Sequence, residues 1–92
     1  MRLVYSEDAV ADLARLRVFI AEKDPAAAAR VAADLVARVE HLGRFPNLGR
    51  SVVDAPEADI VRDAVFGNYV VRYSVHGDAV VVLRVWHHYE DR

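Results

Sequence analysis

The sequence predicts an α+β fold: a short N-terminal strand, an antiparallel helical hairpin, then a three-stranded antiparallel meander in one sheet packed on the helices. Two observations carry this prediction. Apolar residues recur at helical spacing through the first half of the chain, whereas the last third alternates at the two-residue period of strands. With 92 residues, 54% of them apolar, the chain is long enough for one core, and we expect a single domain over residues 1–92.

A strand and two helices are expected in the first half of the chain. The run RLVY at residues 2–5 is short and apolar, as strands are. Ser6 is a suitable N-cap for a helix over residues 7–22, and Pro25 fits the first turn of a second helix that ends at Gly43 in a left-handed cap. The short connection requires an antiparallel hairpin. The apolar stripe of the first helix consists of Ala9, Leu13, Leu16 and Ile20, and that of the second of Ala28, Val31, Leu35, Val39 and Leu42.

A long connection at residues 43–59 separates the helices from the strands. It holds two of the four glycines and two of the three prolines of the chain. Connections of this length are usually functional or held in place by their own side chains. We expect Phe45 and Leu48 to anchor this one to the core.

The last third of the chain predicts the meander. The runs DIVRDAVFG, NYVVRYSVHG and DAVVVLRVWHH are separated by Gly-Asn and Gly-Asp, which favour hairpin turns. The last run is apolar on both faces and should be the most buried strand. In a regular strand, Val81, Leu83 and Val85 would lie on one face, and Val80, Val82, Arg84 and Trp86 on the other.

The composition excludes several classes of protein. Twelve Lys and Arg against 14 Asp and Glu give a net charge of −2, so the chain lacks the basic excess typical of nucleic-acid-binding proteins. The absence of cysteine removes disulfides, thiolate zinc sites and cysteine nucleophiles. No run approaches the roughly 18 apolar residues of a membrane span, and the N-terminus has no signal-type apolar region. We therefore expect a soluble, unprocessed, cytoplasmic protein that needs no cofactor.

Several landmarks occur in order along the chain. They are the capped first helix with its DLARL stripe, the Asp-Pro start of the second helix, FPNLGR with Pro46, Gly49 and Arg50, then Arg62 ahead of NYVVRYSV, and a last strand running into WHHYEDR. This ordered combination resembles the RelE/ParE family of toxins from bacterial type II toxin-antitoxin systems, over essentially the whole chain. The resemblance implies a small toxin that a cognate antitoxin holds inactive. Members differ in target: RelE-like toxins cut mRNA in the ribosome, and ParE-like toxins poison DNA gyrase.

A RelE-like cutter would be a metal-independent endoribonuclease, which needs a general base, a general acid and cations at the scissile phosphate. Where the resemblance places the lysines and arginines of such cutters, this chain has Val61, Asp63 and Val70, and an aspartate beside a phosphate is unfavourable. One feature favours this alternative, because some ribosome-dependent relatives end their last strand with a His-Tyr pair, matched here by His88 and Tyr89. The phosphate clamps would then be Arg84 and Arg92.

The ParE-like alternative is the preferred hypothesis, because it needs no catalytic residues and only a surface that binds gyrase. The acidic net charge, the long Pro-Gly connection and the short C-terminus are similar to that branch. Arginine and tyrosine are favoured interface residues. The predicted target-binding residues are Arg62, Arg84, His87, His88, Tyr89 and Arg92. A third alternative is an inactive module that still binds its antitoxin.

One helical hairpin is too small to cover the apolar surface of this chain. We therefore expect a cognate antitoxin segment that folds on binding, either as a helix in a groove or as a strand added to the sheet edge. The complex should be obligate in cells, and this chain alone should not bind DNA sequence-specifically. The predicted antitoxin-binding residues are Leu13, Leu16, Ile20, Val80 and Val82.

Several of these residues also have a purely structural interpretation. Adjacent strand residues point to opposite faces, so His87 and His88 cannot readily share one metal ion, and no metal site is predicted. Trp86 is expected to cover the sheet, and Arg50 to hold its own loop. Outward-facing arginines such as Arg72 and Arg84 can pair with acids on the surface.

Overall fold

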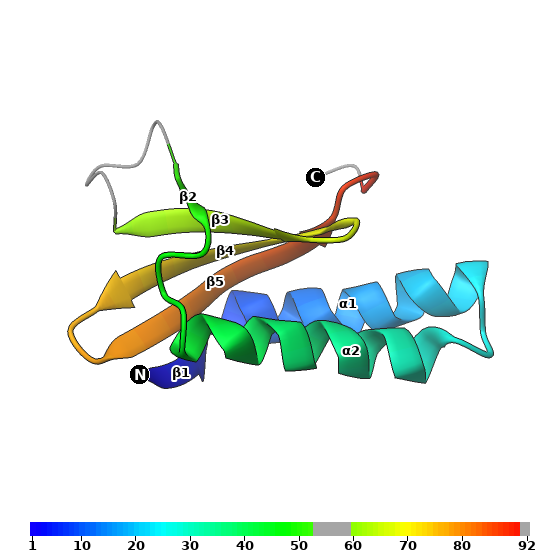
Figure 1. Ribbon diagram of the computed structural model, residues 1–92. Coiled ribbons are helices and arrows are strands. Elements are labelled where there is room, and N and C mark those ends of the chain that lie inside the picture. Colours follow the sequence, from blue (N-terminus) through cyan, green and yellow to red (C-terminus); the bar gives the residue numbers. More distant parts are fainter. Residues whose placement is uncertain (53–59, 91–92) are drawn as a thin grey trace.

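The computed structural model describes residues 1–52 and 60–90. In these ranges five strands form one sheet in the order β1-β5-β4-β3-β2, and both helices cover one of its faces (Figure 1). This confirms the predicted α+β fold. It adds one strand that was not predicted, β2, and makes the sheet mixed, because β1 runs parallel to β5. The elements are β1 (Arg2–Tyr5), α1 (Glu7–Lys23), α2 (Ala28–Glu40), the 3-10 helix η1 (His41–Gly43), β2 (Arg50–Ser51), β3 (Val61–Phe66), β4 (Tyr69–His76) and β5 (Ala79–His87).

The start of α1 is fixed by the predicted cap. The Ser6 hydroxyl accepts a hydrogen bond from the Ala9 N–H at 3.0 Å and donates one to the Leu83 carbonyl at 3.0 Å. One side chain therefore both caps α1 and ties its first turn to β5. None of the helices in the described ranges is long and apolar enough to cross a membrane.

The second helix begins later than predicted. Residues 25–27 form a turn, and α2 starts at Ala28. The carboxylate of Asp24 accepts the Ala27 N–H at 3.2 Å, so Asp24 stabilises this turn instead of capping a helix at Pro25. The antiparallel hairpin is unaffected by this three-residue change.

Gly43 does not form the predicted left-handed cap. It lies within η1, and in the described residues the glycines with positive φ are Gly67 and Gly77, at 60° and 55°, in the two hairpin turns. A Cβ on Gly43 would lie 3.0 Å from the carbonyl oxygen of Met1, whose amino group donates to the Gly43 carbonyl at 2.9 Å. Glycine is therefore required at position 43 because the N-terminus approaches the backbone closely there, and not because the backbone is left-handed.

A bulge in β5 changes which of its side chains share a face. Arg72 is opposite Arg84 but Tyr73 is opposite Val82, so Leu83 is an extra residue. Regular alternation along β5, as predicted, is therefore wrong at this point. The bulge brings together on the helix side five residues with 0% exposure: Val71 and Tyr73 of β4 and Val80, Val82 and Val85 of β5. As predicted, β5 has the most buried residues of any strand described, these three together with Ala79 and Trp86.

The connection after α2 is held by buried polar contacts and not by its apolar side chains. The Tyr73 hydroxyl donates to the Pro46 carbonyl at 2.7 Å and accepts the Gly49 N–H at 2.8 Å. Phe45 and Leu48 are 56% and 55% exposed, so the prediction that they anchor this segment is wrong. A buried hydroxyl satisfies backbone groups that would otherwise be unpaired, which an apolar contact cannot do.

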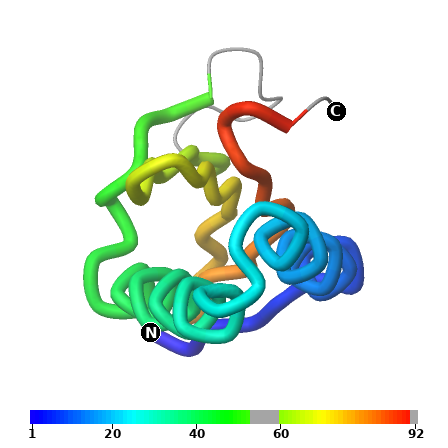
Figure 2. Tube along the Cα trace, turned by 90° about the vertical axis from the view of Figure 1, so that its right-hand side faces the viewer, coloured from blue at the N-terminus to red at the C-terminus, as the bar shows by residue number. Residues whose placement is uncertain are grey.

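Arg62, and not Arg50, makes the arginine contact to this connection. Its guanidinium donates to the Gly49 carbonyl at 2.7 Å, whereas Arg50 is exposed and its side chain makes no hydrogen bond within the described ranges. Figure 2 shows the resulting arrangement: the connection from α2 to β2 rises along one side of the molecule, and the segment after β5 lies over α1 on the other.

Candidate functional site

The chain folds back on itself immediately after β5. The His88 N–H donates to the Asn68 carbonyl at 2.6 Å, the Glu90 N–H to the His87 carbonyl at 2.9 Å, and the Tyr89 N–H to Nδ1 of His87 at 3.1 Å. These bonds place the end of β5 against the turn between β3 and β4. We name this surface, residues 87–90 with Asn68 and Tyr69, the C-terminal rim.

His87 supports the rim from below. The centroid of its ring lies 5.2 Å from the ring centroid of Phe19 of α1, 5.0 Å from that of Tyr69 and 5.6 Å from that of Tyr89. Because three aromatic rings surround it, His87 is half-buried and belongs to the packing of the rim.

His88 and Tyr89 are the side chains that the rim offers to solvent. Their ring centroids are 5.3 Å apart in an edge-to-face arrangement, and Tyr89 is 78% exposed. The structure thus brings together three of the predicted target-binding residues, His87, His88 and Tyr89. Among the described residues, the outer two of them, His88 and Tyr89, are exposed.

A carboxylate that was not predicted organises the strand leading to the rim. Asp12 of α1 is 2% exposed and accepts Nε and Nη2 of Arg84 at 2.8 and 3.1 Å, and the Val85 N–H at 2.8 Å. It also accepts Nη1 of Arg15. Burial by itself would raise the pKa of Asp12, but the hydrogen bonds from Arg84, Val85 and Arg15 outweigh it and lower the pKa to about 2.

Arg15 extends this network to the rim. Its Nε and Nη2 donate to the two carboxylate oxygens of Glu90 at 2.8 and 3.1 Å, and Nη2 also donates to the Val85 carbonyl at 3.1 Å. Glu90 in turn accepts the His87 N–H at 3.0 Å. The hydrogen bond from Arg15 lowers the pKa of Glu90, against the effect of burial. Arg15 and Glu90 therefore attach the rim to α1.

The two predicted target-binding arginines that the structure describes, Arg62 and Arg84, do not join the rim as free cations. Arg84 makes its two bonds to Asp12, as the structural interpretation of that residue expected. Arg62 faces the helix side of the sheet opposite Tyr73, whereas His87 is opposite Tyr69, four residues along β4 and roughly 13 Å away. Arg92 lies outside the described residues.

Arg72 is ion-paired in the same way. Its Nε and Nη2 donate to the two oxygens of Asp63 at 2.8 and 3.0 Å, and its guanidinium lies 5.3 Å from the centroid of the Trp86 ring. The bond to Asp63 raises the pKa of Arg72. Trp86 is 8% exposed, which agrees with its expected role as a cover of the sheet.

The residues predicted to bind the antitoxin lie mainly in the core. Leu16 is 1% exposed, Ile20 7%, and Val80 and Val82 0%, while Leu13 is half-buried. Leu13, Leu16 and Ile20 nevertheless line a cavity of about 240 Å³ between α1 and α2, which a partner side chain can enter. Val80 and Val82 are fully enclosed by the sheet and the helices, so they cannot contact a partner while the sheet remains packed.

No metal centre is formed by the described residues. No three His, Asp or Glu side chains in those ranges come close enough to hold an ion. His76, which lies at the turn between β4 and β5, is instead paired with the Ser74 hydroxyl at 3.0 Å.

Sequence reasoning missed Asp12, Arg15 and Glu90, although one signal was present. Asp12 is three residues after Ala9 and four before Leu16, so it lies on the buried stripe of its helix, where an acid must have a partner. Its partners, Arg84 and Val85, could not be predicted, because they follow the bulge in β5 and no residue pattern indicated that bulge.

Comparison with known proteins identifies the family. Residues 3–92 match the family model described as "ParE toxin of type II toxin-antitoxin system, parDE". The chain belongs to the RelE/ParE family of type II toxins. The family resemblance seen in the sequence is therefore confirmed.

Curated relatives of this toxin include proteins of Caulobacter vibrioides named for RelE. Toxin RelE1 is 40% identical over 83 residues, which is 88% of this chain and 86% of that protein. Toxin RelE3 is 35% identical over 81 residues, covering 88% of this chain and 87% of that protein. The chromosomal ParDE system from P. aeruginosa includes a chain with the same fold, with a TM-score of 0.79, 23% identity and 95% of each chain covered.

Proposed function

We propose that this toxin stops growth by binding DNA gyrase through the C-terminal rim, without catalysing a reaction. One observation carries the proposal: three arginines on the elements that support the rim, α1, β4 and β5, are already ion-paired. Arg15, Arg72 and Arg84 each donate at least two hydrogen bonds to carboxylates. Phosphoryl chemistry needs cations that are free to offset the developing charge on the phosphate. A protein partner needs only exposed aromatic and polar side chains of fixed orientation, such as His88 and Tyr89.

The ParE family model and the shared fold with a ParDE chain support this proposal. The cognate antitoxin would hold the toxin inactive in the cytoplasm, where gyrase is found. The rim would act as one rigid unit, because hydrogen bonds to Asn68 and Arg15 fix it from both sides.

A RelE-like mRNA endoribonuclease is the second candidate. It is favoured by the names of the Caulobacter relatives and by the side-by-side exposure of His88 and Tyr89, a possible acid–base pair. In this alternative, His88 is the proton donor or acceptor. A third candidate, an inactive antitoxin-binding module, predicts no effect on growth at all.

The deciding experiment is to induce the toxin alone in bacteria and follow labelled thymidine and methionine incorporation during the first minutes. Gyrase inhibition stops thymidine incorporation first, whereas mRNA cleavage stops methionine incorporation first. Purified gyrase should also lose supercoiling activity when the toxin is added. Early translational arrest, with supercoiling unaffected, would refute the gyrase proposal.

Two variants test the chemistry of the rim. His88→Gln keeps a polar side chain but removes proton transfer, so it should retain toxicity if the rim is a contact surface and lose it if His88 is catalytic. Tyr89→Ala should weaken a contact surface about tenfold or more. His76→Ala, at the opposite end of the sheet, is the matched control.

A further inference from the structure

The side chain of His87 is a hydrogen-bond acceptor within the C-terminal rim. Its Nδ1 atom accepts the N–H of Tyr89 at 3.1 Å. A ring nitrogen accepts only when it carries no proton, so the one proton of the neutral imidazole must be on Nε2. The bond spans two residues, as in an Asx turn, where an Asn or Asp side chain accepts the N–H two residues later. The observed rim therefore requires an uncharged His87.

This hydrogen bond holds the middle of the rim. On either side of Tyr89 the backbone is fixed, because the His88 N–H donates to the Asn68 carbonyl and the Glu90 N–H to the His87 carbonyl. Tyr89 itself is 78% exposed, and its ring contacts the rings of His87 and His88. Loss of the acceptor on His87 would thus free the side chain that the rim exposes most.

The surroundings of His87 can accommodate a charged ring. Its ring lies between that of Phe19 on α1 and that of Tyr69 on β4, with centroids 5.2 and 5.0 Å away. Aromatic rings at such distances attract a cation. Protonation of His87 therefore removes the acceptor without expelling the ring from its place.

Charged groups in the rim and on α1 act on the His87 ring in opposite directions. The Glu90 carboxylate, which accepts the backbone N–H of His87 at 3.0 Å, favours a proton on the ring. Arg15 opposes this effect, since its Nε and Nη2 donate to the same carboxylate at 2.8 and 3.1 Å. Lys23 also opposes it, because its Nζ lies 5.7 Å from the centroid of the Phe19 ring. The effects of the acid and the two cations therefore partly cancel.

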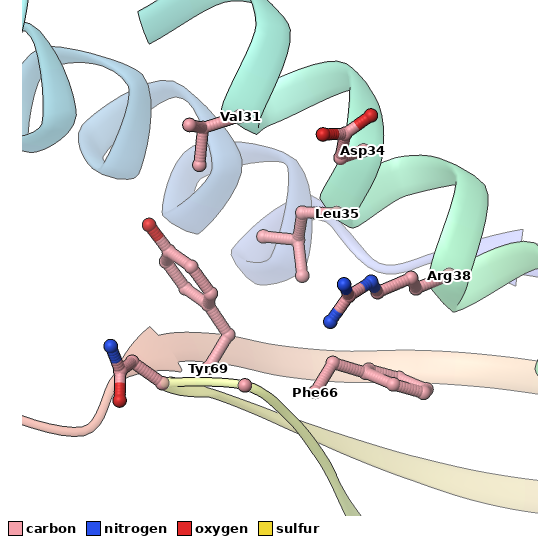
Figure 3. A pocket seen from close by; sticks show the side chains of 8 residues that line it. Val31, Asp34, Leu35, Arg38, Phe66 and Tyr69 are labelled. Atoms are coloured by element: carbon pink, nitrogen blue, oxygen red, sulfur yellow. The ribbon is translucent and has the colours of Figure 1, made fainter. Parts of the chain in front are cut away.

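The titratable groups of β4, α2 and His88 complete these surroundings. Burial raises the pKa of the Tyr69 hydroxyl, which therefore stays uncharged near neutral pH. Beyond the Tyr69 ring, α2 contributes one charge of each sign, Asp34 and Arg38, to a cavity of about 140 Å³ (Figure 3). His88 is exposed and carries a second imidazole, so an experiment has to separate its protonation from that of His87.

We propose that the neutral imidazole of His87 positions the target-binding rim, and that a proton taken from solvent on Nδ1 releases Tyr89 and weakens target binding. His87 is thus a positioning residue that acts through Tyr89. An imidazole changes its charge between about pH 5 and 8, so small changes around neutral pH alter the fraction of toxin with a formed rim. The effect on binding rests on the proposed function, whereas the hydrogen bond and its loss do not depend on the target.

Nuclear magnetic resonance of the full chain tests the positioning of the rim without a target. At about pH 8, Nδ1 of His87 should have the ¹⁵N resonance of an unprotonated ring nitrogen, and the Tyr89 amide proton that of a bonded amide. On lowering the pH to about 5.5, both resonances should change with one midpoint. A proton on Nδ1 at the higher pH, or a Tyr89 amide that does not follow the His87 ring, would overturn the proposal.

Two variants of His87 test the effect on binding. His87→Asn offers an oxygen to the Tyr89 N–H across the same span and does not titrate, whereas His87→Phe keeps an aromatic ring but offers no acceptor. The affinity of wild type for purified gyrase, relative to that of His87→Asn, should fall roughly three- to tenfold between about pH 8 and 5.5. His87→Phe should bind weakly at both values. A constant ratio between wild type and His87→Asn would contradict the positioning role.

The other histidines supply the controls. His88→Gln and His76→Ala should both keep the pH dependence of wild type, since His87 is intact in each. If the dependence is lost in His88→Gln and kept in His87→Asn, the proposal is wrong. A toxin that shows the coupled resonances but binds gyrase at no pH would refute the proposed function and leave the positioning of the rim by His87 confirmed. Binding to gyrase that depends on pH without coupled resonances would refute this inference alone.

Discussion

Replacing Asp12 with Asn should destabilise the fold by roughly 2 kcal/mol at pH 7. The lowering of its pKa from 3.8 to about 2 corresponds to roughly this free energy of unfolding, since one pKa unit equals about 1.4 kcal/mol. Asparagine retains an oxygen that can accept the Val85 N–H but loses the charge that pairs with Arg84 and Arg15. Those two arginines are 49% and 42% exposed, so water can solvate them in the variant. The expected loss of stability is therefore smaller than the roughly 3–5 kcal/mol lost when one partner of a fully buried ion pair is removed.

Thermal unfolding measures this effect directly. For a domain of this size, 1 kcal/mol shifts Tm by about 4–8 °C, so Asp12→Asn should melt roughly 8–16 °C below wild type. Asp34→Asn, an exposed acid of α2 without a partner in the described ranges, should melt within about 3 °C of wild type. If Asp12→Asn melts as high as this control, the network does not stabilise the fold and the reasoning is wrong.

The same network predicts a specific pH dependence. A carboxyl group whose folded pKa is lowered contributes its full stability above its unfolded pKa near 3.8, and loses it as pH falls through the folded value near 2. The difference between wild type and Asp12→Asn should therefore be constant from pH 7 to about pH 5 and vanish between about pH 4 and 2. Chemical denaturation across this range checks the prediction, and a constant difference down to pH 2 would contradict it.

Two further variants test the polar contacts of Tyr73 and Glu90. Tyr73→Phe leaves the Gly49 N–H and the Pro46 carbonyl unpaired, so it should lower the free energy of unfolding by about 1–3 kcal/mol and speed proteolysis after Arg44. If Tyr73→Phe is cleaved no faster than wild type, the Tyr73 hydroxyl does not hold this connection. Glu90→Ala removes the attachment of the rim to Arg15, so toxicity should fall several-fold while Tm changes by less than about 5 °C. Unchanged toxicity would mean that the rim needs no fixed orientation.

The regular elements of this fold could be predicted because each depends on local signals. Ser6 as a cap, apolar spacing on α1, and the glycines at positions 67 and 77 each act within a few residues of chain. The predicted helix boundaries were wrong where a contact with another part of the chain determined the end of the helix. Asp24 stabilises a turn that delays α2, and the N-terminus packs against Gly43, which takes the place of a left-handed cap.

The candidate site could be predicted only in part, because its contacts join distant segments. The exposed pair His88 and Tyr89 was found from its position after the last strand. The network of Asp12, Arg15 and Glu90 was not, since it depends on the bulge at Leu83 and on the packing of α1 against β5. Charged residues on a helix do not by themselves indicate which strand they will meet.

The pairing of β1 with β5 has a consequence for the time at which the toxin becomes complete. Ser6 is bonded to Leu83, 77 residues later, and β5 lies between β1 and β4 in the sheet. At about 5–20 residues per second, a ribosome needs roughly 4–15 s to make the intervening chain. During that interval the nascent polypeptide has neither a closed sheet nor a rim. Under the proposed function, a product truncated before β5 lacks the target-binding surface and should not be toxic. An antitoxin already present in the cell would then have several seconds in which to bind the chain before it can act.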